Sequence, residues 1–106
     1  MFRIEWEPRA VEELSRIRAF DRARILGAVS AHLTEQANVV AGHRKQVFDL
    51  RAPWSEGHEP FWQLKVEPYR VFYDVLPSPQ GARAEGLVMI RAVRRKPPGK
   101  RTEEIL

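Results

Sequence analysis

The alternation of apolar and polar residues in the first third of the chain predicts a strand followed by two helices. Residues 2–6 alternate with a period of two, which is typical of a half-buried strand. Pro8 suits the first turn of a helix, and Asp21 is a good N-cap for a second one. Two apolar stripes follow at helical spacing: Val11, Leu14 and Ile17, then Ile25, Leu26, Val29 and Leu33. The short break near residues 20–21 therefore predicts a helical hairpin that ends near residues 36–37.

The second half of the chain has the pattern of strands. A weaker candidate at residues 46–50 is followed by three clear strand segments: 61–66, 71–75 and 87–93. A long connection over residues 52–60 separates the first two, Pro68 indicates a corner between the next two, and Pro79 and Gly81 predict a turn before the last. The segment 87–93 is apolar on both faces, which favours a central strand. We expect regular structure to end at Pro97.

The order of these elements, helices first and most strands later, predicts an α+β fold. We expect the helical hairpin to pack on one face of a mostly antiparallel sheet, in the order β-α-α-β-β-β. A length of 106 residues leaves room for one domain. We assign residues 1–96 to that domain and residues 97–106 to a basic C-terminal tail.

The composition excludes several classes of function. The chain has no cysteine, which rules out a disulfide framework, a thiolate zinc site and a cysteine nucleophile. It has no glycine-rich phosphate loop and no cluster of metal ligands, so we expect neither a metal nor a cofactor. His32 is expected on the second helix, and His43 and His58 are expected to be solvated in loops. No apolar run approaches the roughly 20 residues that span a bilayer, and residues 1–15 carry four acids, so we expect a cytoplasmic protein without membrane contact.

The net charge of +4 comes from one end of the sequence. Residues 1–37 and 38–90 each contain six basic and six acidic side chains, whereas residues 91–106 contain six basic and two acidic ones. A neutral body with a basic end indicates an anionic partner.

Basic residues on the predicted strands suggest where such a partner binds. The side chain of Lys65 is expected to point away from the apolar set that includes Trp62 and Leu64, and Arg70 follows the corner at Pro68. On the last strand, Arg91 and Arg95 are expected to share one face of the sheet. Cations that converge on one face would bind phosphate, with Tyr69 or Trp54 available for base stacking. The alternative is an ordinary solvated sheet face.

Three segments carry a resemblance to a known family. Residues 61–75, with the sequence FWQLKVEPYRVFYDV, resemble the strand pair W-R-L-R-V-x-x-Y-R-V-x-Y of the RelE/ParE toxin superfamily. Residues 4–14 resemble the strand, proline and helical hairpin that open this family, and residues 88–95 resemble its ending V-x-x-V-G-H-R. The resemblance covers nearly the whole chain in the expected order.

The resemblance implies a toxin of a type II toxin–antitoxin system, held by its cognate antitoxin in a possible hetero-oligomer. RelE-like members cleave mRNA in the ribosomal A site without a metal, and ParE-like members poison DNA gyrase. We favour a ribosome-dependent mRNA endoribonuclease that inhibits translation. The alternatives are a gyrase inhibitor and a catalytically silent homologue that binds RNA or the antitoxin.

Carried over residue by residue, the resemblance implies catalytic roles for Lys65, Arg70 and Arg95. Of these three, Lys65 alone could act as a base, because an arginine stays protonated. Gln63 stands where many RelE-like nucleases have a basic residue, Val93 replaces the usual glycine, and no tyrosine follows Arg95. We expect further RNA contacts from Gln63, Tyr69, Arg91, Arg94, Lys96, Lys100 and Arg101.

Overall fold

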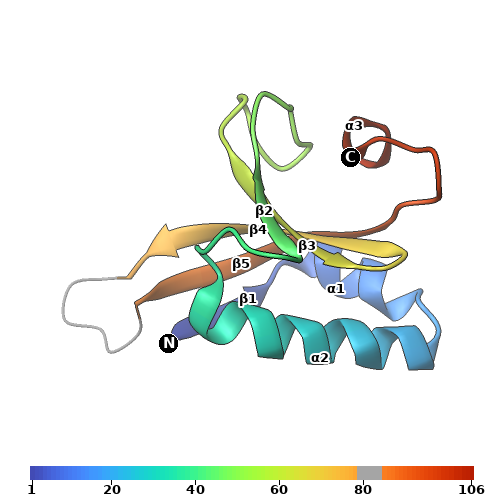
Figure 1. Ribbon diagram of the computed structural model, residues 1–106, viewed down its shortest axis with the longest axis horizontal. Coiled ribbons are helices and arrows are strands. Elements are labelled where there is room, and N and C mark those ends of the chain that lie inside the picture. Colours follow the sequence, from blue (N-terminus) through green and yellow to red (C-terminus); the bar gives the residue numbers. More distant parts are fainter. Residues whose placement is uncertain (79–84) are drawn as a thin grey trace.

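A five-stranded sheet forms the centre of the molecule (Figure 1). The computed structural model describes residues 1–78 and 85–106, so the predicted turn at Pro79 and Gly81 lies outside the described residues. The strands are β1 (Phe2–Trp6), β2 (Arg44–Val47), β3 (Phe61–Val66), β4 (Tyr69–Pro77) and β5 (Gly86–Arg95). They lie in the order β1-β5-β4-β3-β2, with β1 parallel to β5 and the other neighbours antiparallel. The predicted α+β fold is confirmed.

Two helices, α1 (Pro8–Ser15) and α2 (Ala19–Gln36), cover one face of the sheet (Figure 1). The predicted N-cap is wrong, because α2 begins before Asp21. The Asp21 carboxylate is instead buried and accepts hydrogen bonds from Arg18 Nε at 2.8 Å and from the Tyr69 hydroxyl of β4 at 3.2 Å. The bond from Arg18, with further ones from Arg24 and Tyr69, lowers the pKa of Asp21. This buried carboxylate ties the start of α2 to the sheet.

The main core lies between the helices and the sheet. Ile25 and Leu33 of α2 pack against the helix-facing side chains of the strands, among them Leu64 and Ile90. Trp62 is stacked on Tyr73, with ring centroids 6.1 Å apart. The alternation predicted for residues 61–66 is therefore correct: even-numbered positions of β3 face the helices.

The opposite face of the sheet carries a second apolar cluster that the sequence pattern did not predict. Its buried members are Val47, Ala52, Phe61, Phe72 and Ala92, and Leu50, Trp54, Ile105 and Leu106 pack against them. The segment after β2 and the short helix α3 (Thr102–Ile105) both rise over this face (Figure 1). Regular structure thus resumes after Pro97, because the last two residues have an apolar surface to cover.

A β-bulge between β4 and β5 changes which residues of β5 share a face. Phe72 pairs with Ala92 and Tyr73 pairs with Ile90, so Arg91 is the extra residue. After the bulge, Arg95 pairs with Tyr69 on the helix side, whereas Arg91 contacts Asp74 on the other side. The prediction that Arg91 and Arg95 share one face is therefore wrong.

Replacing Trp62 tests the position of the core. Trp62 is only 9% exposed, and we expect Trp62→Ala to lower the free energy of unfolding by about 3–5 kcal/mol because it leaves a cavity between sheet and helices. Urea denaturation measures this loss. The exposed Val11→Ala serves as the control and should change stability by less than about 0.5 kcal/mol. A small effect at Trp62 would contradict the placement of the core.

Candidate functional site

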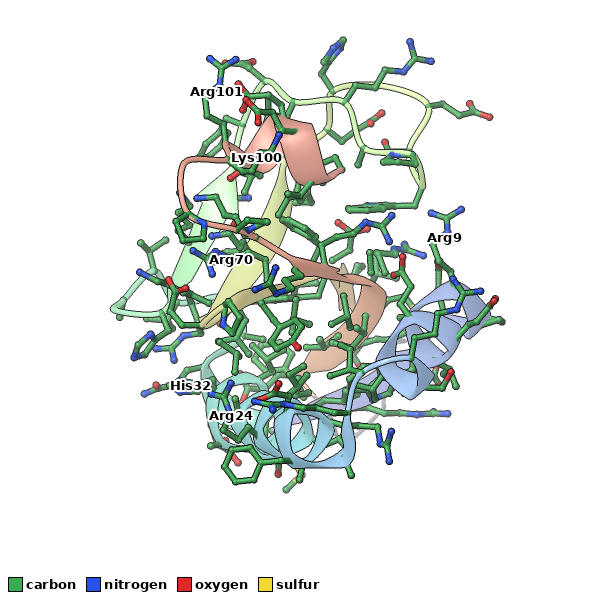
Figure 2. All side chains as sticks on the ribbon, turned by 90° about the vertical axis from the view of Figure 1, so that its right-hand side faces the viewer. Arg9, Arg24, His32, Arg70, Lys100 and Arg101 are labelled. Carbon is green, nitrogen blue, oxygen red and sulfur yellow. The ribbon has the colours of Figure 1, made fainter. Side chains whose placement is uncertain are left out.

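A cavity of about 270 Å³ lies at one corner of the sheet, beside the segment that follows β5. Its lining residues are Gly42, His43, Lys45, Gln63, Lys65, Arg70 and Lys96, and we call it the cationic cavity. Figure 2 shows Arg70 between Lys100 and Arg101 on one side and Arg24 and His32 on the other. The cavity therefore combines residues from β2, β3, β4 and the hairpin before β2, together with Lys96.

Strand pairing brings these cations together. Lys65 of β3 lies opposite Arg70 of β4, and Lys45 of β2 lies opposite Gln63. Odd-numbered positions of β3 point away from the helices, so both pairs lie on the same face. Two cations directly opposite each other repel, and a compensating anion is needed.

Glu67 supplies that anion in the free protein. Its Oε1 lies 3.2 Å from Lys65 Nζ and 3.1 Å from a terminal nitrogen of Arg70. Hydrogen bonds from Lys65 and then Arg70 lower the pKa of Glu67. The Glu67 side chain is itself 60% exposed, so this carboxylate can move away when another anion arrives.

Arg70 is the most buried cation of the cavity, with 6% of its surface exposed. It donates one hydrogen bond to the carbonyl oxygen of Tyr69 at 2.9 Å and one to Glu67. Its Nε is buried and has no partner among the residues that the structure describes. An unpaired buried donor is costly, and an anion that reached it would recover that cost.

Lys45 and Lys96 add charge that no acid among the described residues balances. Within residues 1–78 and 85–106, no carboxylate lies within 4.0 Å of either ammonium group. The backbone N–H of Lys96 donates to the carbonyl oxygen of Pro68 at 2.7 Å, which fixes Lys96 beside the β3–β4 corner. A second cavity of about 320 Å³, lined by Arg70, Lys96 and Lys100 among others, extends the cationic surface toward the tail.

Several residues predicted for the site therefore meet in space. Lys65, Arg70, Gln63 and Lys96 line the cationic cavity, and Lys100 lines the cavity beside it. Gln63 also lies 3.5 Å from the Thr102 hydroxyl at the start of α3.

Other predicted residues are engaged elsewhere. Arg91 pairs with Glu7 and with Asp74, whose Oδ2 lies 2.7 Å from Arg91 Nε. Arg94 pairs with Glu13. These two arginines are half-buried and paired with acids.

Three more predicted residues lie outside the cationic cavity. Arg101 pairs with Glu103 and Glu104 of its own segment. Arg95 lies on the helix side of the sheet, as a consequence of the bulge. Tyr69 is buried, and burial followed by its bond to Asp21 raises its pKa, so its ring is not free to stack on a base.

Trp54, the other aromatic proposed for stacking, packs on Phe61 and Phe72 of the second cluster. It lines a different cavity of about 360 Å³, together with Asp74 and Arg91. Neither candidate aromatic reaches the cationic cavity.

Sequence reasoning missed Lys45 and His43 of the cavity. Lys45 joins the site because β2 pairs with β3, and the long connection between these strands hides their register in the sequence. His43 joins it because the carbonyl oxygen of His43 accepts a hydrogen bond of 2.8 Å from the Lys65 N–H. A prediction that residues 44–47 pair with 61–64 would have found both.

Neither a metal-binding cluster nor a membrane-spanning helix is found among the described residues. No group of three or more histidine and acidic side chains among them is arranged to hold a metal ion. Within the same residues, every helix is too short or too polar to span a lipid bilayer.

Comparison with known proteins gives one family and one informative fold. A family model described as "ParE toxin of type II toxin-antitoxin system, parDE" matches residues 4–96. A chain in the crystal structure of the archaeal RelE–RelB complex from Pyrococcus horikoshii OT3 is similar in fold, with a TM-score of 0.61. It is 16% identical, and the alignment covers 94% of this chain and 98% of that one. No curated protein matches the chain.

Removing the internal anion tests the cationic cavity. With Glu67→Gln, we expect inorganic tripolyphosphate to bind roughly threefold to tenfold more tightly, because Lys65 and Arg70 lose their competing carboxylate. Isothermal titration calorimetry measures the difference. The control Glu56→Gln removes an exposed carboxylate outside the cavity. It should tighten tripolyphosphate binding only by the amount that the change in net charge gives. Equal affinities for wild type and Glu67→Gln would show that the anion binds elsewhere.

Proposed function

The chain belongs to the ParE toxin family of type II toxin–antitoxin systems, and on that premise we propose that it is a toxin that cleaves mRNA on the ribosome. The observation that carries this proposal is the cationic cavity. Lys45, Lys65, Arg70 and Lys96 line one space, and a buried donor of Arg70 has no partner among the described residues. Such a cavity fits the doubly esterified phosphate of an RNA backbone.

Cleavage would proceed by attack of an RNA 2′-hydroxyl on the neighbouring phosphorus. The transition state gathers negative charge on the phosphoryl oxygens, and fixed cations stabilise it more than they stabilise the ground state. Arg70 is the best placed to do so, because its guanidinium is held by the Tyr69 carbonyl and needs little reorganisation. Lys65 and Lys96 would bind the same phosphate from either side.

The third cation of this proposal is Lys96 rather than Arg95. Family resemblance suggested Arg95, but this residue lies opposite Tyr69 on the helix side of the sheet. Lys96 comes next in the chain and lines the cavity. Because of the bulge at Arg91, the third phosphate-binding cation of this proposal is one residue later in the chain than the resemblance implies.

Inhibition of DNA gyrase is the second candidate function. The family description that matches this chain names ParE toxins, the group that acts on gyrase. The absence of a tyrosine after Arg95 and the presence of Gln63 also favour it, since both depart from the nuclease pattern. A silent homologue that binds only RNA or an antitoxin is the remaining outcome.

We also propose that a cognate antitoxin covers the cationic cavity with an acidic segment. Among the described residues, Lys45 and Lys96 carry uncompensated charge beside Arg70. Complementary charge on a partner speeds its association and makes its binding specific. The structurally similar chain from Pyrococcus horikoshii was solved in complex with RelB. Antitoxin and RNA would then compete for one surface in a toxin–antitoxin hetero-oligomer.

Mapping mRNA ends and scoring DNA breaks in the same induced bacterial culture tests the function. We expect wild type to produce cuts within translated codons, and Lys65→Gln with Lys96→Gln to reduce cutting by more than about tenfold because two phosphate contacts are lost. Both lysines have solvent access, so the fold should survive, as circular dichroism can verify. The control Arg9→Gln removes one exposed cation on α1 and should cut like wild type.

Other outcomes of that experiment assign the function differently. Intact mRNA together with gyrase-dependent DNA breaks would contradict the nuclease proposal and support gyrase inhibition. Normal growth with intact mRNA and intact DNA, while folded protein is present, would indicate a homologue that binds RNA or the antitoxin without being toxic.

Competition tests the antitoxin surface. We expect the protein encoded beside this chain to displace a fluorescent RNA oligonucleotide from it. The Lys65→Gln, Lys96→Gln double variant should bind that protein at least about tenfold more weakly, because charge pairs are lost. Fluorescence anisotropy at two salt concentrations measures both effects. Simultaneous binding of RNA and that protein would contradict a shared site.

A further inference from the structure

The hairpin before β2 holds His43 at the mouth of the cationic cavity. Ala41 and Arg44 exchange two backbone hydrogen bonds, of 3.2 and 2.9 Å, which close a turn with Gly42 and His43 at its tip. Gly42 has a φ of 51°, a conformation that glycine adopts at no steric cost. The carbonyl oxygen of His43 then accepts from the Lys65 N–H at 2.8 Å, so the tip is fixed to β3.

His43 is exposed and is one of the residues that line the cavity. The charged groups that line it too are Lys45, Lys65, Arg70 and Lys96, and Glu67 bridges Lys65 and Arg70 at the edge. His43 carries the imidazole of this lining, a side chain that commonly serves as a general base. Its neighbours in the lining supply positive charge, and no carboxylate is among them.

A second histidine supports the ring of His43 from α2. The rings of His32 and His43 lie edge to face, with centroids 5.6 Å apart. Arg44 donates to His32 Nδ1 at 2.7 Å, and because a guanidinium has donors only, that nitrogen accepts and His32 is neutral. Burial, and then the charges of Arg44 and His43, lower the pKa of His32. His32 can thus stay uncharged when His43 gains a proton.

We propose that His43 is the proton acceptor in the cleavage reaction, a role that rests on the ribonuclease function proposed above. The 2′-hydroxyl gives its proton to the imidazole of His43, and the 2′-oxygen forms a bond to phosphorus. The bond from phosphorus to the 5′-oxygen breaks, and the ammonium of Lys65 protonates that oxygen. The products are a 2′,3′-cyclic phosphate and a free 5′-hydroxyl, and His43 returns the extra proton through water to Lys65. No metal or cofactor takes part in this balance.

Single-turnover cleavage of mRNA in preformed ribosome complexes, followed from pH 5.5 to 8.5, tests this role. We expect the wild-type rate to rise with pH and then level off, because neutral imidazole is the active form. His43→Ala should lose about 100-fold or more in rate and lose that pH dependence. Added imidazole should restore part of the rate of this variant, which a purely structural role would not allow.

Two controls separate chemistry from binding and folding. His58→Ala removes an exposed histidine outside the cavity lining and should leave the rate and the pH profile unchanged. His43→Ala should bind an uncleavable 2′-deoxy-substituted RNA within about twofold of wild type, since the lysines and the arginine that bind phosphate are unchanged.

Failure of the His43 role and failure of the ribonuclease function would give different results. Cleavage by His43→Ala at the wild-type rate and with the wild-type pH profile would overturn the role of His43 alone and leave the nuclease intact. No cleavage by the wild-type chain at any pH would overturn the ribonuclease function and this role with it.

Discussion

The central strand β4 is buried on both faces, and the rest of the fold follows from this constraint. Val71, Phe72 and Tyr73 are fully buried. Tyr73 points to the helices and donates to the Ala37 carbonyl oxygen at 2.7 Å, whereas Phe72 points to the second cluster. A strand of this kind needs a cover on each side. The helical hairpin provides one cover, and the segment after β2 together with the C-terminal residues provides the other. At Arg70, near the start of β4, the apolar covering gives way to the cationic cavity.

The distribution of charge in space differs from its distribution along the sequence. The excess of basic residues lies in 91–106, but Arg91, Arg94, Lys100 and Arg101 each have a carboxylate partner. Among the described residues, the uncompensated charge in the cavity belongs to Lys45 of β2 and to Lys96, which directly follows β5. The strand pairings and the corner contact of Lys96 bring them beside Arg70. The pattern of ion pairs, more than the net charge of +4, indicates where an anion can bind.

Local periodicity predicted the parts of the fold that depend on neighbouring residues. The helical hairpin, the order of elements and the outward direction of Lys65 follow from alternation within short segments. The bulge at Arg91, the pairing of Lys45 with Gln63 and the second apolar cluster depend on residues far apart in the chain, so no local pattern reveals them. The N-cap prediction failed for the same reason: a short acidic residue before an apolar stripe suits a cap, but Asp21 accepts a long-range bond from Tyr69. Of the candidate site, the sequence therefore anticipated Lys65, Arg70, Gln63 and Lys96 but not Lys45 or His43.

A crystal structure with bound RNA would show whether the cations of the cavity bind the RNA backbone. The chain would be crystallised with a short RNA that carries a 2′-deoxy substitution at one position, which prevents cleavage there. We expect a phosphate within hydrogen-bonding distance of Lys65, Arg70 and Lys96, with Arg70 Nε engaged and the Glu67 carboxylate displaced. RNA bound away from these residues, or a phosphate in the cavity with Glu67 still bridging Lys65 and Arg70, would contradict it.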